Sequence, residues 1–283
     1  MYTNLVLSGG AFKGIALLGA LKYLEELDYI SYIKNYTGSS AGGIICFFII
    51  LGYKPYEIKE MLLNEINNIT DLDFNNISNF LYDYGIDNCE NNKKILSKYL
   101  KQKTDLEDIT FIEFTKKFGT NLTLTGSNLT KHTLDYFNID NTPNMSIIQA
   151  VLITSCIPFI FKPIEYNDCL YVDGGIYNNF AIDQYKKNKN ETLGINIKSN
   201  IIIKNDNFIN YCNNIIYSII DKLTYDNIKK NNYNIINITF DYHQIDDIKF
   251  SFKDLNIEVK DSVINKYYDF GYNEFKKLFK VDF

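Results

Sequence analysis

Hydrophobic residues near the start of the chain form short continuous runs, each followed by glycines and then by a stretch with helical spacing. The run Asn4–Ser8 ends at Gly9 and Gly10, which is typical of a buried strand entering a tight turn. In Ile15–Leu27 apolar residues recur at helical spacing, with charged residues on the opposite face. The segment therefore predicts a strand, a glycine turn and a helix, in that order.

The same order repeats in the next stretch of sequence. Residues 32–37 predict a second strand, a turn rich in glycine and serine follows, and Ala41–Leu51 predicts a buried helix. Two consecutive units of this kind indicate a parallel sheet with crossover helices. The expected fold class is α/β.

The remaining pattern continues this alternation. It predicts helices at Pro55–Ile66, Met145–Thr154, Asn207–Lys229 and Asp261–Phe279, and strands at Asn121–Gly126, Leu170–Asp173, Leu193–Ile197 and Ile235–Phe240. Residues 67–118 are polar and rich in Asn and Lys, and we expect short helices there that cover a site as a cap or lid. No repeat and no Pro/Gly/Ser-rich linker divides the chain, so residues 1–283 are interpreted as a single domain.

Composition and charge narrow the classes of function. The chain is 46% hydrophobic and 22% charged, as in ordinary globular proteins. A net charge of −5 argues against nucleic-acid binding and against a purely electrostatic grip on anionic membranes. All 29 basic residues are lysine, which we interpret as the mark of an AT-rich genome. Any anion site must therefore use Lys or backbone N–H groups.

Cysteine usage and the absence of targeting signals predict a location. The five cysteines are odd in number and show no C-x-x-C spacing, which favours a reducing compartment. No signal peptide is visible, and no apolar run near the N-terminus approaches the ~20 residues that span a bilayer. We expect a protein that is cytoplasmic or peripheral on intracellular membranes. With only two histidines, His132 and His243, and no clustered cysteines, we expect no metal site and no cofactor.

Ser40 is the first candidate for chemistry. It lies at the centre of Gly38-Ser39-Ser40-Ala41-Gly42, which matches the G-x-S-x-G pattern of serine hydrolases. In such an elbow the glycines Gly38 and Gly42 permit a sharp turn from strand to helix, and the helix N-terminus favours developing negative charge. A plain Gly/Ser turn, with Ser39 or Ser40 only capping the helix, is the alternative.

The second candidate is the glycine loop after the first strand. It reads Gly9-Gly10-Ala11-Phe12-Lys13-Gly14. Glycines let backbone N–H groups converge, as an oxyanion hole requires, although a tight turn alone explains them too. A P-loop is excluded because Ile15 follows Gly14, and the Rossmann fingerprint is excluded because Ala11 stands where it needs glycine.

Asp173 is the third candidate. It ends a predicted buried strand and is followed by Gly174 and Gly175. An acidic group at such a strand end points into the crevice where α/β sheets bind ligands, and burying it is costly unless it is paired or used. An ordinary Asp-Gly turn is the alternative.

These three features, in this order and each at a strand end, resemble the patatin-like phospholipases, acyl hydrolases with a Ser-Asp dyad. The resemblance covers approximately residues 3–200 and includes the Pro- and Phe-containing stretch 155–163 and the pair Asn178-Asn179. It implies a three-layer α/β/α sandwich with a mainly parallel central sheet. The C-terminal helices and strand of 201–283 are expected to pack on that core.

The resemblance also implies roles for the candidate residues. Ser40 is the expected nucleophile, Asp173 the base, and the backbone of Gly9–Phe12 the oxyanion hole, with the motif supported by Lys13, Gly14, Gly38, Gly42, Gly174 and Gly175. The implied activity is that of a phospholipase A-type lipid acyl hydrolase acting through an acyl-enzyme. Its implied partner is a phospholipid or another acyl-ester lipid, with peripheral membrane contact. Two positions depart from the family pattern: Ala11 replaces a glycine, and Ala181 stands where proline is common.

Two alternatives stay open at this stage. One is an α/β-hydrolase-type esterase with a Ser40-Asp173-His243 triad; His132 precedes Asp173 and does not fit the required order. The early position of Ser40, after one strand-loop-helix unit, favours the dyad. The other alternative is a catalytically silent lipid-binding module, which would need neither the serine, the aspartate nor the glycine loop.

Overall fold

A single mixed sheet forms the centre of the molecule. The computed structural model describes residues 1–71, 80–200, 208–229, 233–241, 249–251 and 256–280. In the eight-stranded sheet the order is β10-β9-β1-β2-β4-β8-β7, with β5 also paired to β4. The strands are β1 (Asn4–Leu7), β2 (Asn35–Gly38), β4 (Asn121–Asn128), β5 (Thr133–Phe137), β7 (Ile164–Tyr166), β8 (Cys169–Asp173), β9 (Thr192–Ser199) and β10 (Asn234–Phe240). The neighbours from β10 to β4 are parallel, whereas β5, β7 and β8 pair antiparallel.

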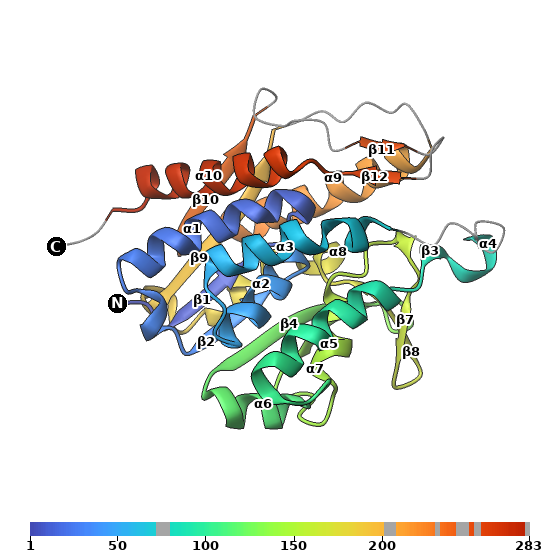
Figure 1. Ribbon diagram of the computed structural model, residues 1–283, viewed down its shortest axis with the longest axis horizontal. Helices are drawn as coiled ribbons and strands as arrows, with labels where there is room; N and C mark the ends of the chain where they lie inside the picture. The colour runs from blue at the N-terminus through green and yellow to red at the C-terminus, as the bar shows by residue number, and fades with distance from the viewer. Residues whose placement is uncertain (72–79, 201–207, 230–232, 242–248, 252–255, 281–283) are drawn as a thin grey trace.

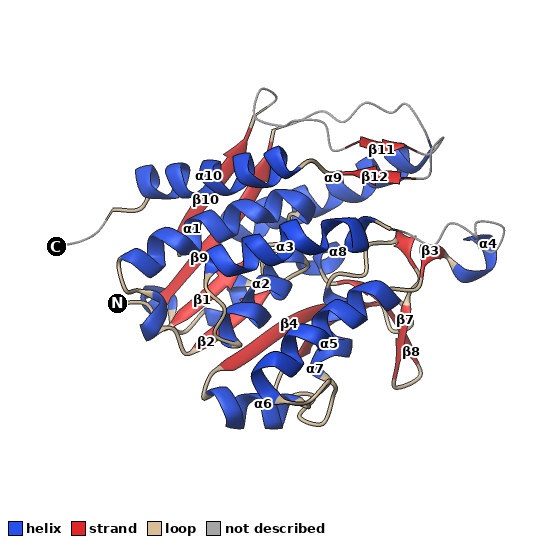
Figure 2. Cartoon of the chain, in the orientation of Figure 1, coloured by secondary structure: helices blue, strands red, loops and turns tan. Residues whose placement is uncertain are grey.

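Helices cover both faces of this sheet (Figures 1 and 2). One face carries α1 (Ile15–Glu26), α2 (Ala41–Ile50), α3 (Pro55–Thr70), α5 (Glu90–Thr104), α6 (Phe111–Phe118), α7 (Ile147–Thr154) and α10 (Asp261–Leu278). The other face carries α8 (Gly175–Asn178) and α9 (Phe208–Lys229). Outside the main sheet, β3 (Gly85–Asp87) pairs with β6 (Phe159–Phe161) near α4 (Phe80–Asp83), and β11 (Lys249–Ser251) pairs with β12 (Asn256–Glu258). The expected three-layer α/β/α sandwich is confirmed.

The apolar run of β1 is explained by burial on both faces. Leu5 and Leu7 belong to the large core beneath α1 and α2, whereas Val6 belongs to a smaller core on the opposite face. Phe180 completes that smaller core, and Ile228 of α9 packs against it. Parallel strands covered on both sides read as continuous hydrophobic runs rather than as alternating ones.

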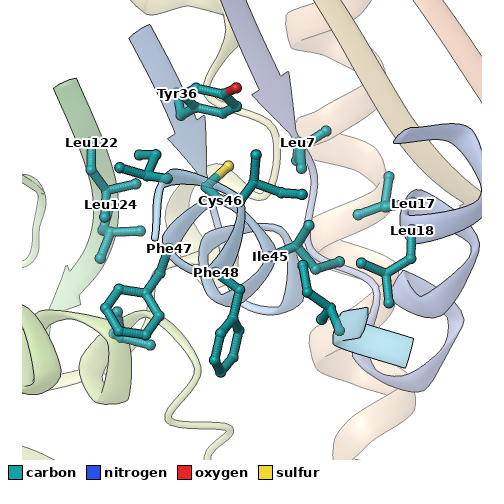
Figure 3. Packing of buried hydrophobic residues seen from close by; sticks show 14 of the residues in the cluster. Leu7, Leu17, Leu18, Tyr36, Ile45, Cys46, Phe47, Phe48, Leu122 and Leu124 are labelled. Atoms are coloured by element: carbon teal, nitrogen blue, oxygen red, sulfur yellow. The ribbon is translucent and has the colours of Figure 1, made fainter. Parts of the chain in front are cut away.

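The helix α2 lies inside the large core (Figure 3). Cys46 and Phe47 are fully buried, and Phe47 stacks on Phe114 of α6 with ring centroids 5.9 Å apart. Side chains of β1, β2 and β4 surround the helix, including Leu7 and Leu124. A helix that is apolar on every side is stable only in such surroundings. Its N-terminus is therefore held firmly against the ends of the strands.

The strand β4 brings two other strand ends together. It pairs with β2 up to Leu124, which is opposite Gly38, and with β5 along residues 124–128. Because β5 occupies one edge of β4, β2 and β8 share the other edge, and β8 pairs there beyond the end of β2. Asp173, the last residue of β8, is opposite Gly126. The ends of β2 and β8 thus lie next to each other along one strand.

The predicted helices and strands are present with small shifts at their ends, but the expectation for residues 67–118 was wrong in part. In place of a loose set of short helices, α3 continues to Thr70 and α5 is a helix of 15 residues. Leu96 and Leu100 of α5 are buried in the core. In the part of the chain that the structure describes, no helix is long and apolar enough to cross a membrane.

Candidate active site

Ser40 occupies a strained turn between β2 and α2. Its backbone has φ 51° and ψ −126°, a conformation that non-glycine residues rarely adopt. A Cβ at Gly38 would lie 2.5 Å from Gly42, and a Cβ at Gly42 would lie 2.5 Å from the carbonyl oxygen of Leu7. The two motif glycines therefore allow α2 to begin directly against the strand ends, as a nucleophile elbow requires.

Neighbouring hydroxyl groups hold this turn. The N–H of Ser40 donates to Oγ1 of Thr154 at 3.2 Å, and the hydroxyl of Thr125 donates to Oγ of Ser39 at 2.8 Å. Ser39 is buried and faces β4, so its side chain supports the turn. Ser40 is 7% exposed and lines a cavity, so it is the one of the two serines that a substrate can reach.

Asp173 lies beside Ser40. The Ser40 side chain favours its ionised form, and the N–H of Gly175 donates to its Oδ1 at 2.7 Å. The backbone N–H of Asp173 donates to the carbonyl of Cys156 at 2.8 Å. Asp173 is 7% exposed, and this burial raises its pKa to about 6, while Ser40 and the N–H of Gly175 act in the opposite direction.

The glycine loop lies at the same end of the cavity. The N–H of Gly9 donates to the carbonyl of Asn179 at 3.0 Å. Within the described residues, the N–H groups of Gly10 and Ala11 form no backbone hydrogen bond, and both residues line the cavity. The side chain of Phe12 packs against the hydrophobic core. Of the four residues predicted to form an oxyanion hole, Gly10 and Ala11 therefore have the N–H groups best suited to that role.

The remaining motif residues position these groups. A Cβ at Gly14 would lie 2.6 Å from Cβ of Ala41, so this glycine lets the loop approach the start of α2. A Cβ at Gly174 would collide with Thr125 of β4, so Gly174 lets the chain follow that strand closely after Asp173. The glycine loop and the segment after Asp173 therefore need glycine at these positions because a side chain would collide with a neighbouring residue.

A cavity of about 390 Å³ opens above Ser40 and Asp173. Its walls come from the glycine loop, the segment after Cys156, α8, β9 and α9. Besides the residues named above, it is lined by Lys13, Ile157, Pro158, Ile176, Ile197, Ser199, Asn214, Ile216, Tyr217, Ser218, Ile220 and Asp221. Serine, carboxylate and backbone donors thus meet at one end of a largely apolar space.

The sequence matches the patatin-like phospholipase family over residues 5–185, which is more than half of the chain. The chain belongs to this family. Among its relatives, "Probable lipid hydrolase 463L" of Invertebrate iridescent virus 6 is 40% identical over 194 residues, covering 67% of this chain and 66% of the relative. "Uncharacterized protein R571" of Acanthamoeba polyphaga mimivirus is 30% identical over 195 residues, covering 68% of this chain and 64% of the relative. The patatin-like chain therefore spans about two thirds of the length of these relatives.

A solved structure extends the likeness in fold. VipD from Legionella pneumophila superposes with a TM-score of 0.63 at 18% identity, covering 98% of this chain and 66% of VipD. At this identity the likeness concerns the fold alone. The superposition with VipD includes the part of the patatin-like chain that follows residue 185.

Two oppositely charged residues line the cavity of this patatin-like protein and influence each other. Burial lowers the pKa of Lys13, while Asp221 of α9 acts in the opposite direction. Burial also raises the pKa of Asp221, opposed by Lys13 and Lys198. The cavity therefore combines an apolar lining with a lysine from the glycine loop and an aspartate from α9.

Several residues of the site escaped the sequence analysis. Thr154 and Thr125 are buried hydroxyls on α7 and β4, and neither was part of a motif, although Thr154 directly precedes the stretch 155–163. Asn179 was noted only as part of the Asn178-Asn179 pair of the resemblance, yet its carbonyl accepts a hydrogen bond from the N–H of Gly9. The lid was expected in 67–118, whereas α9 lines the cavity and none of the described residues of 67–118 does. His243 lies outside the described residues.

Proposed function

We propose that this protein is a lipid acyl hydrolase that cleaves fatty-acyl esters through a Ser40-Asp173 dyad. The observation that carries the proposal is that Ser40 and the buried Asp173 line the same end of one cavity, where the Ser40 side chain favours the ionised carboxylate. A serine hydroxyl needs a base within hydrogen-bond reach to become a nucleophile, and this one has such a base. The family to which the chain belongs, and the relative named as a probable lipid hydrolase, support a lipid ester as substrate.

The first half of the reaction forms an acyl-enzyme. Oγ of Ser40 attacks the ester carbonyl carbon while its proton passes to the Asp173 carboxylate. The carbonyl oxygen becomes an oxyanion that accepts hydrogen bonds from the N–H groups of Gly10 and Ala11. When the tetrahedral intermediate collapses, the bond to the alcohol breaks and Asp173 returns the proton to the departing alkoxide.

The second half releases the fatty acid. A water molecule attacks the acyl-Ser40 ester, and Asp173 accepts its proton. The oxyanion is held by the same two N–H groups, and collapse of the second tetrahedral intermediate returns the proton to Oγ of Ser40. A carboxylate whose pKa is about 6 suits both steps, because it is ionised at neutral pH and yet basic enough to accept a proton.

The lining of the cavity supports an acyl chain with a polar neighbour. Ile157, Ile176 and Ile197 offer apolar contacts to an acyl chain. Lys13 is a cation close to the glycine loop and suits the phosphate of a phospholipid. A phospholipase A-type activity is therefore the form of lipid hydrolysis that we propose.

Product analysis with two variants tests this proposal. The wild-type protein and Ser40→Ala are incubated with mixed phospholipid vesicles, and fatty acids and lysolipids are quantified. We expect Ser40→Ala and Asp173→Asn each to lower turnover by a factor of at least about 10³, because each removes a group that reacts in both steps. Fatty-acid release by Ser40→Ala at the wild-type rate would end the proposal.

The triad and the silent module are separated by further measurements. His243→Ala is expected to keep activity, whereas a triad requires it to lose activity as severely as Asp173→Asn. Hydrolysis of a soluble p-nitrophenyl ester, with Ser40→Ala as control, distinguishes an enzyme from a silent lipid-binding module. A wild-type rate equal to that of Ser40→Ala would favour the module.

A further inference from the structure

The helix α9 carries an unusual set of exposed hydrophobic residues. Within the described part of the chain, six large hydrophobic side chains of this helix are exposed, more than on any other helix: Tyr211, Ile215, Tyr217, Ile219, Leu223 and Tyr225. Four of them, Tyr211, Ile215, Ile219 and Leu223, are spaced four residues apart and are 51%, 44%, 51% and 43% exposed. Residues four apart lie on the same side of a helix, so these four form a continuous apolar stripe.

The stripe lies on the side of α9 that faces away from the cavity. The cavity is lined by six residues of the same helix: Asn214, Ile216, Tyr217, Ser218, Ile220 and Asp221. In a helix of 3.6 residues per turn, the mean direction of these six positions is opposite to that of the stripe, and Ile216 and Ser218 lie at its two flanks. The stripe and most of the cavity lining of α9 are therefore on opposite sides of the helix.

Charge on α9 indicates what covers the stripe. Residues 208–220 contain no charged side chain. Nearer the C-terminus of the helix, Lys222 and Asp226 neutralise each other in an ion pair of 2.9 Å. A helix that binds anionic lipids carries many lysines on its polar face, and this one does not. Its surface complements an uncharged or zwitterionic partner instead.

The residue types within the stripe point the same way. Tyr211 lies at one end of the stripe and is followed by three aliphatic side chains, whereas Tyr225 lies to one side of it. Tyrosine is favoured where an apolar surface meets water, because its ring is apolar and its hydroxyl is polar. This arrangement suits a helix that lies flat in the interfacial layer of a lipid surface.

We propose that the stripe Tyr211-Ile215-Ile219-Leu223 docks α9 onto the surface of a zwitterionic or neutral lipid assembly. This inference rests on the proposed function, because it places the ester-cleaving cavity directly behind the docked helix. Docking holds the wall of the cavity that α9 forms against the lipid surface. Since α9 lies between the two, a lipid enters along the side of the helix or after the helix has shifted.

The test measures binding separately from catalysis. Ser40→Ala protein is mixed with phosphatidylcholine vesicles, and the bound fraction is measured by co-sedimentation, with and without the double change Ile215→Gln and Ile219→Gln. We expect the double change to weaken binding by roughly thirtyfold, because it removes two apolar side chains from the lipid contact. Raising the salt from roughly 0.05 M to 0.5 M is expected to leave binding nearly unchanged, because no charge is involved.

Matched controls separate docking from other effects. Leu106→Gln with Ile112→Gln removes two similarly exposed side chains, 54% and 47% exposed, from another part of the surface, and is expected to bind like the parent. With Ser40 intact, the Ile215/Ile219 variant is expected to keep its rate on a soluble p-nitrophenyl ester and lose its rate on vesicles. If the wild-type protein, with Ser40 intact, binds vesicles but does not hydrolyse their lipids, the proposed function is contradicted and the docking inference is still supported.

Three results would overturn the docking inference. The first is unchanged vesicle binding by the Ile215/Ile219 variant. The second is binding that requires anionic lipid and disappears in high salt. The third is a dimer that the same variant converts to a monomer in light scattering, because a second copy of the chain would then cover the stripe.

Discussion

At the scale of single residues, the Asp173 carboxylate costs stability when it is ionised, and the same burial makes it a stronger base. Burial raises its pKa to about 6, so the folded protein ionises this carboxyl less readily than the unfolded chain does. The N–H of Gly175, which donates to the carboxylate, and the Ser40 side chain reduce this penalty without removing it. The site therefore holds a carboxylate that destabilises the fold at neutral pH and is ready to accept a proton.

Because the buried carboxylate costs stability when it is ionised, we predict that Asp173→Asn stabilises the protein in a pH-dependent way. In the unfolded chain the carboxyl ionises near pH 3.9, so the cost is absent well below that pH and complete above about pH 6. Asparagine keeps the acceptor for the N–H of Gly175 and carries no charge. We expect the free energy of unfolding to increase by about 2–3 kcal/mol at pH 8 and by about 1 kcal/mol at pH 4.5.

Urea unfolding of wild type and Asp173→Asn at the two pH values measures this difference. Ser40→Ala is measured alongside and is expected to destabilise the protein more at pH 8 than at pH 4.5, because it removes a group that lowers the pKa of Asp173. An equal effect of Asp173→Asn at both pH values would show that ionisation of Asp173 does not contribute to the difference in stability.

At the scale of elements, α1 and α10 pack unusually closely through two glycines. A Cβ at Gly271 of α10 would lie 2.6 Å from Cα of Ala16, and a Cβ at Gly19 of α1 would lie 2.5 Å from the backbone nitrogen of Tyr272. Such a contact brings the two helix backbones together. The helices then bury Tyr267 and Phe275 fully.

We predict that Gly271→Ala destabilises the protein by about 2 kcal/mol or more. Alanine favours a helix by about 1 kcal/mol over glycine, but here its Cβ forces the two backbones apart. Asn273→Ala, at an exposed position of the same helix, is expected to be neutral or slightly stabilising. Thermal unfolding of both variants provides the measurement, and a stabilised Gly271→Ala would contradict the close contact.

At the scale of the whole molecule, the described elements after residue 185 pair and pack with those before it. β10 pairs with β9 in parallel along seven residues, and α10 covers α1. The ring of Phe240 on β10 contacts Tyr267 on α10 with centroids 5.1 Å apart. The family match ends at residue 185, yet these contacts join the later elements to the same sheet and core.

We therefore predict that residues 1–200 do not fold independently. Truncation would expose the apolar face of α1 and leave β9 as an unpaired edge strand. The full chain is expected to unfold in one cooperative step, and the fragment to show no cooperative transition by circular dichroism. A monomeric fragment with a sharp transition would divide the chain into two folding units.

The sequence was most informative where a function depends on local geometry. Ser40 and Asp173 could be predicted because glycines next to them mark turns at strand ends. Thr154 accepts a hydrogen bond from the N–H of Ser40 but is far from it in sequence. Only tertiary packing brings the two residues together. The helix α9 was predicted, but its position over the cavity was not, because its apolar residues lie on both of its sides.

The shared edge of β4 has a consequence for how far the molecule can be altered. Ser40 follows β2 and Asp173 ends β8, and both strands are hydrogen-bonded to β4. The spacing of Ser40 and Asp173 is therefore set mainly by main-chain pairing to β4. Substitutions in the core that keep this strand pairing should leave the spacing unchanged. A shift of β8 by two residues along β4 would instead move Asp173 by about 7 Å.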